Sequence, residues 1–287
     1  MNSQSSSELP YIFESEIAQV LEWQPLIDTI ERAMIIFSAG EVAQPVRQIV
    51  PVPGENTIIA AMPAVGEAMA VKVVTLYHDN ARLNLPSHQA VILLFDKSNG
   101  SPLAVLDGRL ITEMRTAAVS AAAARKLAVA VPEVITIMGS GVQARAHAAA
   151  LAQVRSCSEL RLWARNETVG RAVTDELGAR FVADAEQAVR DADIVACTTA
   201  ATEPVLHGDW LKAGAFVTAV GWTPWTDANW TTKPWPIPSS SSRLVLLTRR
   251  PVTFAARVAR FFPRLVKYSP TQKRCQRNRR SSSTRWA

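Results

Sequence analysis

The chain has 287 residues, of which 48% are hydrophobic, so it can bury a sizeable core and divide into two domains of ordinary size. No stretch approaches the roughly 18 consecutive apolar residues of a transmembrane helix, and the polar first ten residues lack the pattern of a signal peptide. We therefore expect a cytoplasmic protein with no membrane partner. Cys157, Cys197 and Cys275 are scattered and odd in number, without the paired spacings of a metal site or a disulfide framework.

The net charge of +6 is unevenly distributed along the chain. Residues 225–287 contain 14 Lys and Arg and one acidic residue, Asp227, so this segment carries 14 − 1 = +13, whereas residues 1–224 carry 17 − 24 = −7. A basic segment after an acidic body is either a nucleic-acid-binding arm or a segment that does not belong to the fold. Only its charge supports the first interpretation, so no nucleic-acid partner is expected.

The first half of the chain predicts a helix, a sheet and a second helix. Apolar residues recur at helical spacing from residue 15 to about Gly40, which marks the expected end. Residues 46–95 hold β-branched and apolar runs broken by Pro, Gly and Asn, and residues 103–108 add a short strand after a turn, so this part predicts a sheet. The alanine-rich segment 116–129 predicts a helix with Thr116 as its N-cap.

From Pro132 the pattern changes to strands that alternate with helices, which is typical of a parallel sheet covered on both faces. The expected strands are 134–139, 159–165, 193–199 and 215–221, with helices at 140–154 and 184–192. We therefore predict an α/β protein with a Rossmann-like dinucleotide-binding domain at 116–224. Residues 1–115 are predicted to form an α+β substrate-binding domain.

The strongest chemical signal is a glycine-rich turn that follows an apolar strand and opens a helix, with Gly139, Gly141 and Ala144 in the pattern Gly-x-Gly-x-x-Ala. In a dinucleotide site the first glycine permits the tight turn, the second lets the backbone approach the pyrophosphate, and the small third residue allows close helix–sheet packing. The free N–H groups of the helix then bind the phosphates. The alternative is a glycine turn with no ligand.

The end of the next predicted strand bears on the choice of cofactor. An NAD-binding site usually has Asp or Glu there to bind the ribose hydroxyls, whereas this chain has Arg165 and Asn166. An arginine suits the 2′-phosphate of NADPH because its planar fork can bind a phosphate through two hydrogen bonds. Arg165 can equally be an exposed charge at a strand end, which leaves NADH as the alternative.

Three basic residues stand out in the predicted substrate domain, namely Arg47, Lys72 and Arg115. Lys72 lies among valines and alanines, and desolvation there would lower its pKa and make it a usable general acid. Together the three cations suit the carboxylate of a small amino or imino acid, although each alone is explained equally well as a solvated surface charge. His88 is either a donor to substrate or cofactor, or a structural residue near a turn.

These residues and their surroundings resemble the ornithine cyclodeaminase/mu-crystallin family over about residues 10–224. The segments that carry the resemblance are QPVR (44–47), MPA (62–64), PSHQA (86–90), SNG (98–100), RTAAVSA (115–121), GSGVQA (139–144), ATEPVL (201–206) and VGW (220–222). The resemblance implies a homodimer that pairs through the substrate domain. It also implies that Arg47, Lys72 and Arg115 bind substrate, with Lys72 as proton donor. The cofactor contacts that it implies are Ser87, His88, Gln89, Arg115, Gly139, Gly141, Val142, Gln143, Ala144, Arg165, Asn166 and Val220.

Within this family, one position separates the activities. The cyclodeaminases carry an aspartate shortly after the strand that ends here near Gly221, and this chain has Thr223 there. A hydroxyl cannot replace a carboxylate as a base at neutral pH. The resemblance therefore implies NADPH-dependent reduction of a cyclic ketimine carboxylate. The alternatives are an ornithine cyclodeaminase, an amino acid oxidoreductase resembling alanine dehydrogenase, and a non-catalytic binder of small ligands such as thyroid hormone.

The resemblance ends where the basic segment begins. Residues 225–287 contain half of the eight tryptophans, which argues against an ordinary disordered segment, and show no amphipathic period. Plausible codons for Trp230 to Pro238 and for Pro251 to Ser269, regrouped in one shifted frame, spell segments that resemble the missing part of the family. We therefore predict a frame slip near Pro224 or Trp225, which would leave the substrate domain incomplete and its activity impaired.

Overall fold

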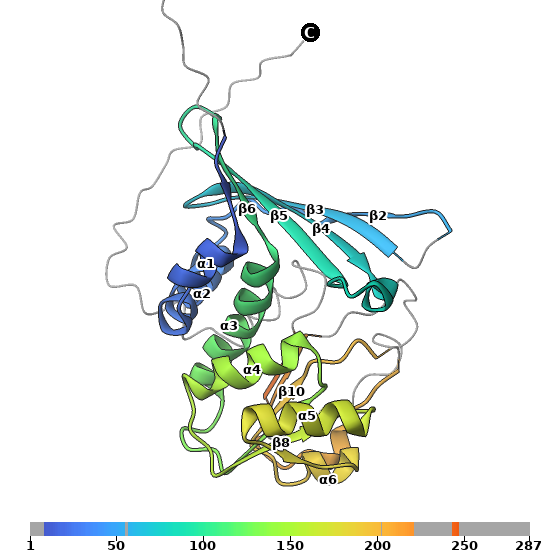
Figure 1. The fold of residues 1–287 in the computed structure, drawn as a ribbon. Coiled ribbons are helices and arrows are strands. Elements are labelled where there is room, and N and C mark those ends of the chain that lie inside the picture. Colours follow the sequence, from blue (N-terminus) through green and yellow to red (C-terminus); the bar gives the residue numbers. More distant parts are fainter. Residues whose placement is uncertain (1–8, 55–56, 202, 221–242, 247–287) are drawn as a thin grey trace, which may run out of the picture.

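The structure is a computed structural model, and it describes residues 9–54, 57–201, 203–220 and 243–246. Two six-stranded sheets lie at opposite ends of the molecule, and helix α3 (Arg109–Leu127) runs from one toward the other (Figure 1). This arrangement confirms the predicted fold class. Among the described residues, no helix is long and apolar enough to cross a membrane.

The first sheet is formed by the amino-terminal part of the chain. Its strands are β1 (Tyr11–Ile12), β2 (Gln48–Pro51), β3 (Thr57–Val65), β4 (Met69–Tyr77), β5 (His88–Phe95) and β6 (Pro102–Asp107), in the order β1-β6-β5-β4-β3-β2. A short 3-10 helix, η1 (His78–Leu83), connects β4 and β5. Neighbouring strands from β2 to β6 are antiparallel, and β1 runs parallel to β6. Short connections join the consecutive strands from β2 to β6, as expected for an antiparallel meander.

The amino-terminal helix differs from the expectation of a single helix over residues 15–40. The structure has two helices, α1 (Glu14–Val20) and α2 (Trp23–Ser38), with an extended residue, Leu21, between them. Pro25 explains the break, because it has no N–H to donate to the carbonyl of Leu21 and is tolerated only in the first turn of a helix. The expected end is correct to within two residues, since Gly40 follows α2 with a φ of 77°.

Helix α3 begins earlier than expected. Gly108 is its N-cap, and the expected N-cap Thr116 lies inside the helix, where its hydroxyl donates to the carbonyl of Thr112 at 2.6 Å. Gly108 lies so close to β5 that an added Cβ would stand 2.8 Å from Cβ of Ala90. The domain boundary expected between residues 115 and 116 thus falls within one continuous helix, which connects the two sheets rigidly.

The second sheet is entirely parallel. Its strands are β7 (Val134–Met138), β8 (Glu159–Trp163), β9 (Arg180–Phe181), β10 (Ile194–Cys197), β11 (Phe216–Ala219) and β12 (Arg243–Leu246), in the order β12-β11-β10-β7-β8-β9. Counted from β7, this is the 3-2-1-4-5-6 order of the Rossmann fold, reversing direction between β7 and β10. Strands β9 and β12 and helix α5 (Glu167–Leu177) were not among the expected elements, and β12 lies inside the basic segment.

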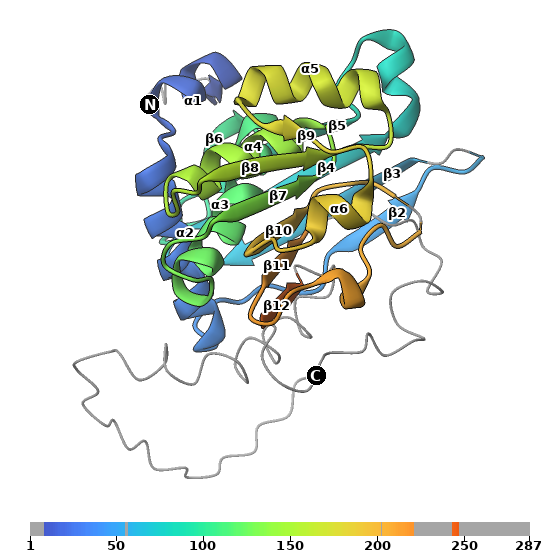
Figure 2. The ribbon, with the colours of Figure 1, turned by 90° about the horizontal axis from the view of Figure 1, so that it is seen from below.

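Helices cover both faces of this sheet, as Figure 2 shows. Helices α3 and α4 (Val142–Ala152) pack on one face against Ile135, Ile137, Ile194 and Phe216. Helix α6 (Ala185–Val189) and the segment around η2 (Gly208–Trp210) cover the other face, against Val134, Met138, Val195 and Val217. Side chains of a strand alternate between the two faces of the sheet, and both faces are covered here. Every side chain of β7, β10 and β11 is therefore buried.

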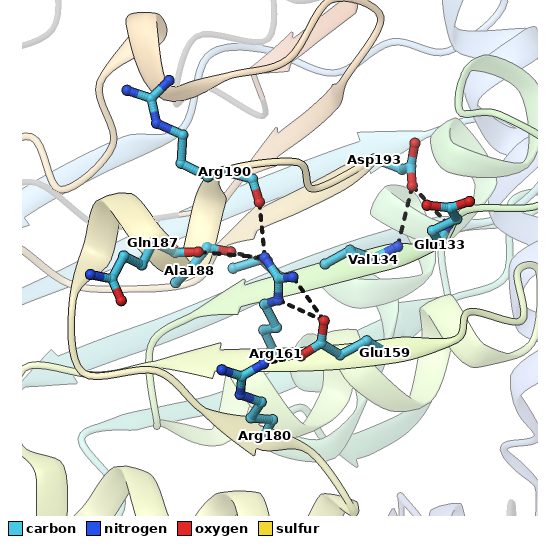
Figure 3. A network of polar contacts seen from close by, with 10 residues as sticks. Glu133, Val134, Glu159, Arg161, Arg180, Gln187, Ala188, Arg190 and Asp193 are labelled. Atoms are coloured by element: carbon cyan, nitrogen blue, oxygen red, sulfur yellow. Dashed lines mark hydrogen bonds and ion pairs between the residues drawn. The ribbon is translucent and has the colours of Figure 1, made fainter.

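A polar network stabilises the edge of the sheet where its strands begin (Figure 3). Arg161 on β8 donates to the carbonyls of Gln187 and Arg190 at the carboxyl end of α6, at 3.4 and 2.9 Å, and pairs with Glu159. The carboxylate of Asp193 accepts from the backbone N–H groups of Glu133 and Val134. Ligands of such sheets bind at the opposite edge, beyond the carboxyl ends of the strands. This network is therefore structural.

Candidate active site

Lys72 lies on the inner face of the first sheet, where α3 covers it. Strand β4 pairs Lys72 with Met62 on one side and Ile92 on the other. The buried residues Ala60 and Val74 belong to the same face, so the aliphatic part of the lysine lies over an apolar surface. Its ammonium donates to the hydroxyl of Thr112 on α3, at 3.3 Å. Lys72 is therefore held between a rigid sheet and the helix that carries Arg115.

The structure brings Arg47, Lys72 and Arg115 into one electrostatic cluster. Burial, with smaller contributions from Arg115 and Arg47, lowers the pKa of Lys72 to about 7. Burial, with a smaller contribution from the nearby Arg47, lowers the pKa of Arg115 to about 10. Burial alone lowers the pKa of Arg47. No carboxylate among the described residues contributes to these shifts, so the cluster is suited to binding an anion.

His88 begins β5 and lies beside this cluster. Leu76 pairs with His88, which places the imidazole on the same sheet face as Lys72. Burial and the charges of Lys72 and Arg115 lower the pKa of His88 to about 4, so the ring is neutral near pH 7. The two neighbours of His88 in the predicted cofactor segment lie in different surroundings. Ser87 and Gln89 are exposed, and strand alternation places Gln89 on the opposite face of the sheet.

The glycine turn between β7 and α4 has the local geometry of a phosphate-binding loop. Gly139 has a φ of 129°, and a Cβ there would stand 2.7 Å from the hydroxyl oxygen of Thr198. Gly141 is the N-cap of α4 and has open space where its Cβ would be, so a ligand can approach its backbone. Ala144 is fully buried against the sheet. The first position thus permits the tight turn, the second lets a pyrophosphate approach the backbone, and the third allows the helix to pack closely on the sheet.

The first turn of α4 is linked to α3 through a side chain. Gln143 donates from its amide nitrogen to the carbonyl of Glu113, at 3.4 Å, two residues before Arg115. Its amide oxygen is buried and has no hydrogen-bond partner among the described residues. A buried acceptor without a donor is costly, and a bound ligand that supplies an N–H or O–H group would satisfy it. The cation cluster and the glycine turn are thus neighbours across α3.

The remaining predicted cofactor residues lie around the carboxyl ends of the parallel strands. Arg165 is exposed after β8. Asn166 is the N-cap of α5, and its side-chain oxygen accepts from the N–H of Val169 at 3.1 Å. Val220 follows β11, and its N–H donates to the carbonyl of Cys197. The predicted departure at Thr223 lies outside the described residues, as does most of the segment 225–287.

Sequence reasoning missed three residues of this region. Thr112 binds the ammonium of Lys72, Glu113 accepts from Gln143, and Thr198 lies against Gly139. The first two lie three and two residues before Arg115, so an earlier predicted start of α3 would have drawn attention to them. Thr198 contacts Gly139 only through the pairing of β7 with β10, which no local pattern predicts.

Comparison with known proteins places this geometry in a family. The family model described as "Ornithine cyclodeaminase/mu-crystallin family" matches residues 12–228. The ketimine reductase mu-crystallin of Mus musculus is 42% identical over 204 residues, which cover 68% of this chain and 65% of that protein. A Delta(1)-pyrroline-2-carboxylate reductase of Bacillus cereus is 32% identical over 219 residues, 73% of this chain and 67% of that protein.

A solved structure agrees with these sequence relatives. The Delta(1)-pyrroline-2-carboxylate reductase of Thermococcus litoralis, in complex with NADH and L-proline, superposes with a TM-score of 0.71 at 34% identity, covering 75% of this chain and 69% of that one. The chain spans about two thirds of the length of these relatives, and slightly less for the mouse protein. Since the family model matches most of its length, the chain belongs to the ornithine cyclodeaminase/mu-crystallin family.

Proposed function

We propose that this chain is a cytoplasmic NADPH-dependent reductase that acts on the C=N bond of cyclic ketimine carboxylates. The observation that carries the proposal is the half-buried cluster of Arg47, Lys72 and Arg115 beside a glycine-turn helix, which no carboxylate among the described residues neutralises. The names of two relatives add support, since one is a ketimine reductase and the other a pyrroline-2-carboxylate reductase.

Reduction of the C=N bond requires a site that binds the substrate carboxylate and a group that donates a proton to the ring nitrogen. Arg47 and Arg115 hold the substrate carboxylate through charge-assisted hydrogen bonds. Lys72 then donates a proton to the ring nitrogen as that atom gains electrons, and its pKa of about 7 suits a general acid near neutral pH. A bound reduced nicotinamide supplies the hydride that adds to the imine carbon. One hydride and one proton convert the imine to a saturated cyclic amino acid.

The residues present fit a dinucleotide. Gly141 leaves its backbone open to a pyrophosphate, and the N–H groups at the start of α4 supply donors. The buried amide oxygen of Gln143 has no hydrogen-bond partner within the described part of the chain. Arg165 is exposed after β8 and occupies the position in which an NAD-binding site usually has an acidic residue that binds the ribose hydroxyls. NADPH is therefore the proposed cofactor, with NADH as the weaker one.

Replacing Arg165 with serine is expected to weaken NADPH binding by about ten- to a hundredfold, since a hydrogen bond to a charged group contributes about 1.5–3 kcal/mol. NADH affinity should stay within about twofold, because NADH lacks the 2′-phosphate. Titration of both cofactors by fluorescence measures this difference. Arg180→Ser is a control in the same domain, because Arg180 is exposed on β9 and pairs with Glu159. An equal loss for both cofactors would contradict the assignment.

The direct test of the function is NADPH oxidation with Delta(1)-pyrroline-2-carboxylate and with its six-membered homologue, combined with identification of the product. We expect proline or the six-membered cyclic amino acid. Ornithine serves as the comparison substrate, and conversion of ornithine to proline without net NADPH oxidation would instead identify a cyclodeaminase. Binding of NADPH without turnover of any of these compounds, in a version of the chain with the frame restored after Pro224, would contradict the proposal.

We further propose that residues after about 224 are translated in a shifted frame. The family match ends at residue 228, and the chain covers only 65% of the mouse relative, which supports this proposal. Sequencing the genomic locus across codons 220–235 tests it, and a confirmed sequence with no family-like alternative frame would contradict it. The reductase assay should therefore be run on the chain as written and on a version with the frame restored after Pro224.

A homodimer that pairs through the first sheet is the proposed assembly. The outer face of this sheet carries exposed large hydrophobic side chains, at positions that strand alternation places together. They are Val50, Ile59, Val65, Tyr77, Val91 and Leu103. A sheet face with this many exposed large hydrophobic side chains is typical of an interface between subunits.

Replacing Ile59 with arginine is expected to convert the dimer to a monomer at micromolar concentration. A charge in the middle of this face would be desolvated without a partner. Sedimentation equilibrium gives the oligomeric state. Val131→Arg is the matched control, because Val131 is an exposed valine between α3 and β7, away from the sheet. A wild-type chain that sediments as a monomer would contradict the proposed assembly.

A further inference from the structure

A chain of hydrogen bonds crosses the buried junction between α3, α4 and β11. The hydroxyl of Ser120 on α3 lies 2.9 Å from Nε2 of His147 on α4 and 2.8 Å from the hydroxyl of Thr218 on β11. Nδ1 of His147 lies 2.7 Å from the carbonyl oxygen of Gln143. Ser120, His147 and Thr218 are all at most 1% exposed. None of them has a role in the proposed reaction so far.

The chemistry of these groups fixes the direction of the chain. A carbonyl oxygen only accepts, so Nδ1 of His147 carries a proton and donates to Gln143. Burial lowers the pKa of His147 to about 4, so the ring is neutral and Nε2 is an acceptor. The hydroxyl of Ser120 therefore donates to His147, and the Ser120 oxygen accepts from Thr218. Donation runs in one direction, from Thr218 through Ser120 and His147 to Gln143.

Each end of this chain lies beside the candidate active site. Thr218 is two residues before Val220, at the carboxyl end of β11, and Gln143 is in the first turn of the glycine-turn helix. Ser120 follows Arg115 by five residues, about 7 Å along α3. The hydrogen bonds thus connect the helix that carries Arg115 to the two elements that line the proposed cofactor site.

The apolar contacts between α3 and α4 in this junction are made mostly by small side chains, which constrain the register between the helices weakly. Helices α3 and α4 meet through small side chains, namely Ala117, Ala118, Ala121, Ala122, Ala146 and Ala150. Alanine contacts allow close approach but change little when one helix slides along the other, whereas hydrogen bonds are directional. A buried polar group in an apolar interface is a known way of specifying register.

We propose that Thr218, Ser120 and His147 form a positioning relay that sets α3, and with it Arg115, relative to the cofactor site. The inference rests on the proposed reductase function. The three residues are at most 1% exposed and act through Arg115 and the glycine-turn helix, so they are positioning residues. Their loss should slow hydride transfer more than it weakens cofactor binding, because a displacement of about 1 Å between reacting groups can cost about a hundredfold in rate.

The test compares Thr218→Val, which has nearly the same shape but no hydroxyl, with Thr218→Ser, which keeps the hydroxyl. Ser120→Ala breaks both bonds of the central residue. The matched control is Thr136→Val. Thr136 is a fully buried threonine of β7 whose hydroxyl donates to the carbonyl of Ala188 on the far face of the sheet, outside the relay. All variants are made in the full chain, both as written and with the frame restored after Pro224, and their folding is checked by circular dichroism and thermal unfolding.

Turnover is measured with NADPH and Delta(1)-pyrroline-2-carboxylate and expressed per NADPH-binding site. Thr218→Val and Ser120→Ala are expected to lower kcat about tenfold, equivalent to about 1.4 kcal/mol, with the Kd for NADPH within about twofold of wild type. The kinetic isotope effect with deuterated NADPH should rise in both variants, because hydride transfer becomes slower. Thr218→Ser and Thr136→Val should keep kcat within about twofold, even if Thr136→Val is less stable.

Three outcomes would overturn the inference, and they can be distinguished. Wild-type kcat and an unchanged isotope effect in Thr218→Val and Ser120→Ala would show that the relay only stabilises the fold. An equal loss in Thr218→Ser and Thr218→Val would show that the methyl packing matters and the hydroxyl does not. If the chain with its frame restored after Pro224 neither binds NADPH nor reduces the ketimine, the proposed function fails, and the relay inference fails with it.

Discussion

Replacing Lys72 with methionine is expected to lower kcat for ketimine reduction by about 10²–10⁴-fold, the usual contribution of a general acid. Methionine fills a similar volume on the inner sheet face but cannot protonate the ring nitrogen. The Kd for NADPH should change little, because Lys72 lies on the first sheet and the glycine turn on the second. Stopped-flow measurement of NADPH oxidation separates the two quantities.

The pH dependence provides a second measure of the same role. Burial lowers the pKa of Lys72 to about 7, so the protonated acid is present below pH 7 and is lost as the pH rises through this value. The kcat/KM of wild type should therefore fall above about pH 7. A bound carboxylate brings a negative charge beside Lys72 and raises its pKa, so the fall in kcat should occur at higher pH.

The control for both measurements is Lys97→Met. Lys97 is exposed in the turn between β5 and β6, where its ammonium donates to the carbonyl of Gly66. The Lys97→Met substitution should leave kcat and the pH profile of kcat unchanged. An alkaline fall that persists in Lys72→Met would assign the titration to the substrate. A Lys72→Met variant with wild-type kcat would remove Lys72 from the mechanism.

Two glycine substitutions should separate the cofactor-binding role of the turn from its structural role. Gly141→Ala should weaken NADPH binding by at least about tenfold with little change in thermal stability, because its Cβ meets only open space and enters the volume left for the phosphates. Gly139→Ala should impair both binding and folding. Its φ of 129° strains an L-residue by about 1–3 kcal/mol, and the new Cβ collides with Thr198.

Isothermal titration with NADPH and thermal unfolding of each variant test this pair. Gly178→Ala serves as the stability control, because Gly178 ends α5 with a φ of 63° and open space around it, away from the turn. It should lose some stability and keep its affinity for NADPH. If folded Gly141→Ala bound NADPH as tightly as wild type, the glycine turn would have no ligand-binding role.

The sequence alone determined the features that depend on local chemistry. The glycine turn, its flanking strand and its helix were predictable because an apolar run, a glycine-rich turn and an alanine-rich segment follow one another within 25 residues. Lys72 was recognisable because a charge in an apolar strand is unusual. The two amino-terminal helices and the start of α3 were predicted wrongly, since Pro25 and Gly108 act through backbone geometry that apolar periodicity does not report.

Only the tertiary structure decided which of these residues meet. Arg47, Lys72 and Arg115 are separated by 25 and 43 residues, and the two arginines lower the pKa of Lys72 because the fold brings all three into one partly desolvated region. The contact of Gly139 with Thr198 and the chain from Thr218 to Gln143 depend on the order of the parallel strands. Strand order is set by the burial of both sheet faces, a property of the whole core that no short segment of sequence contains.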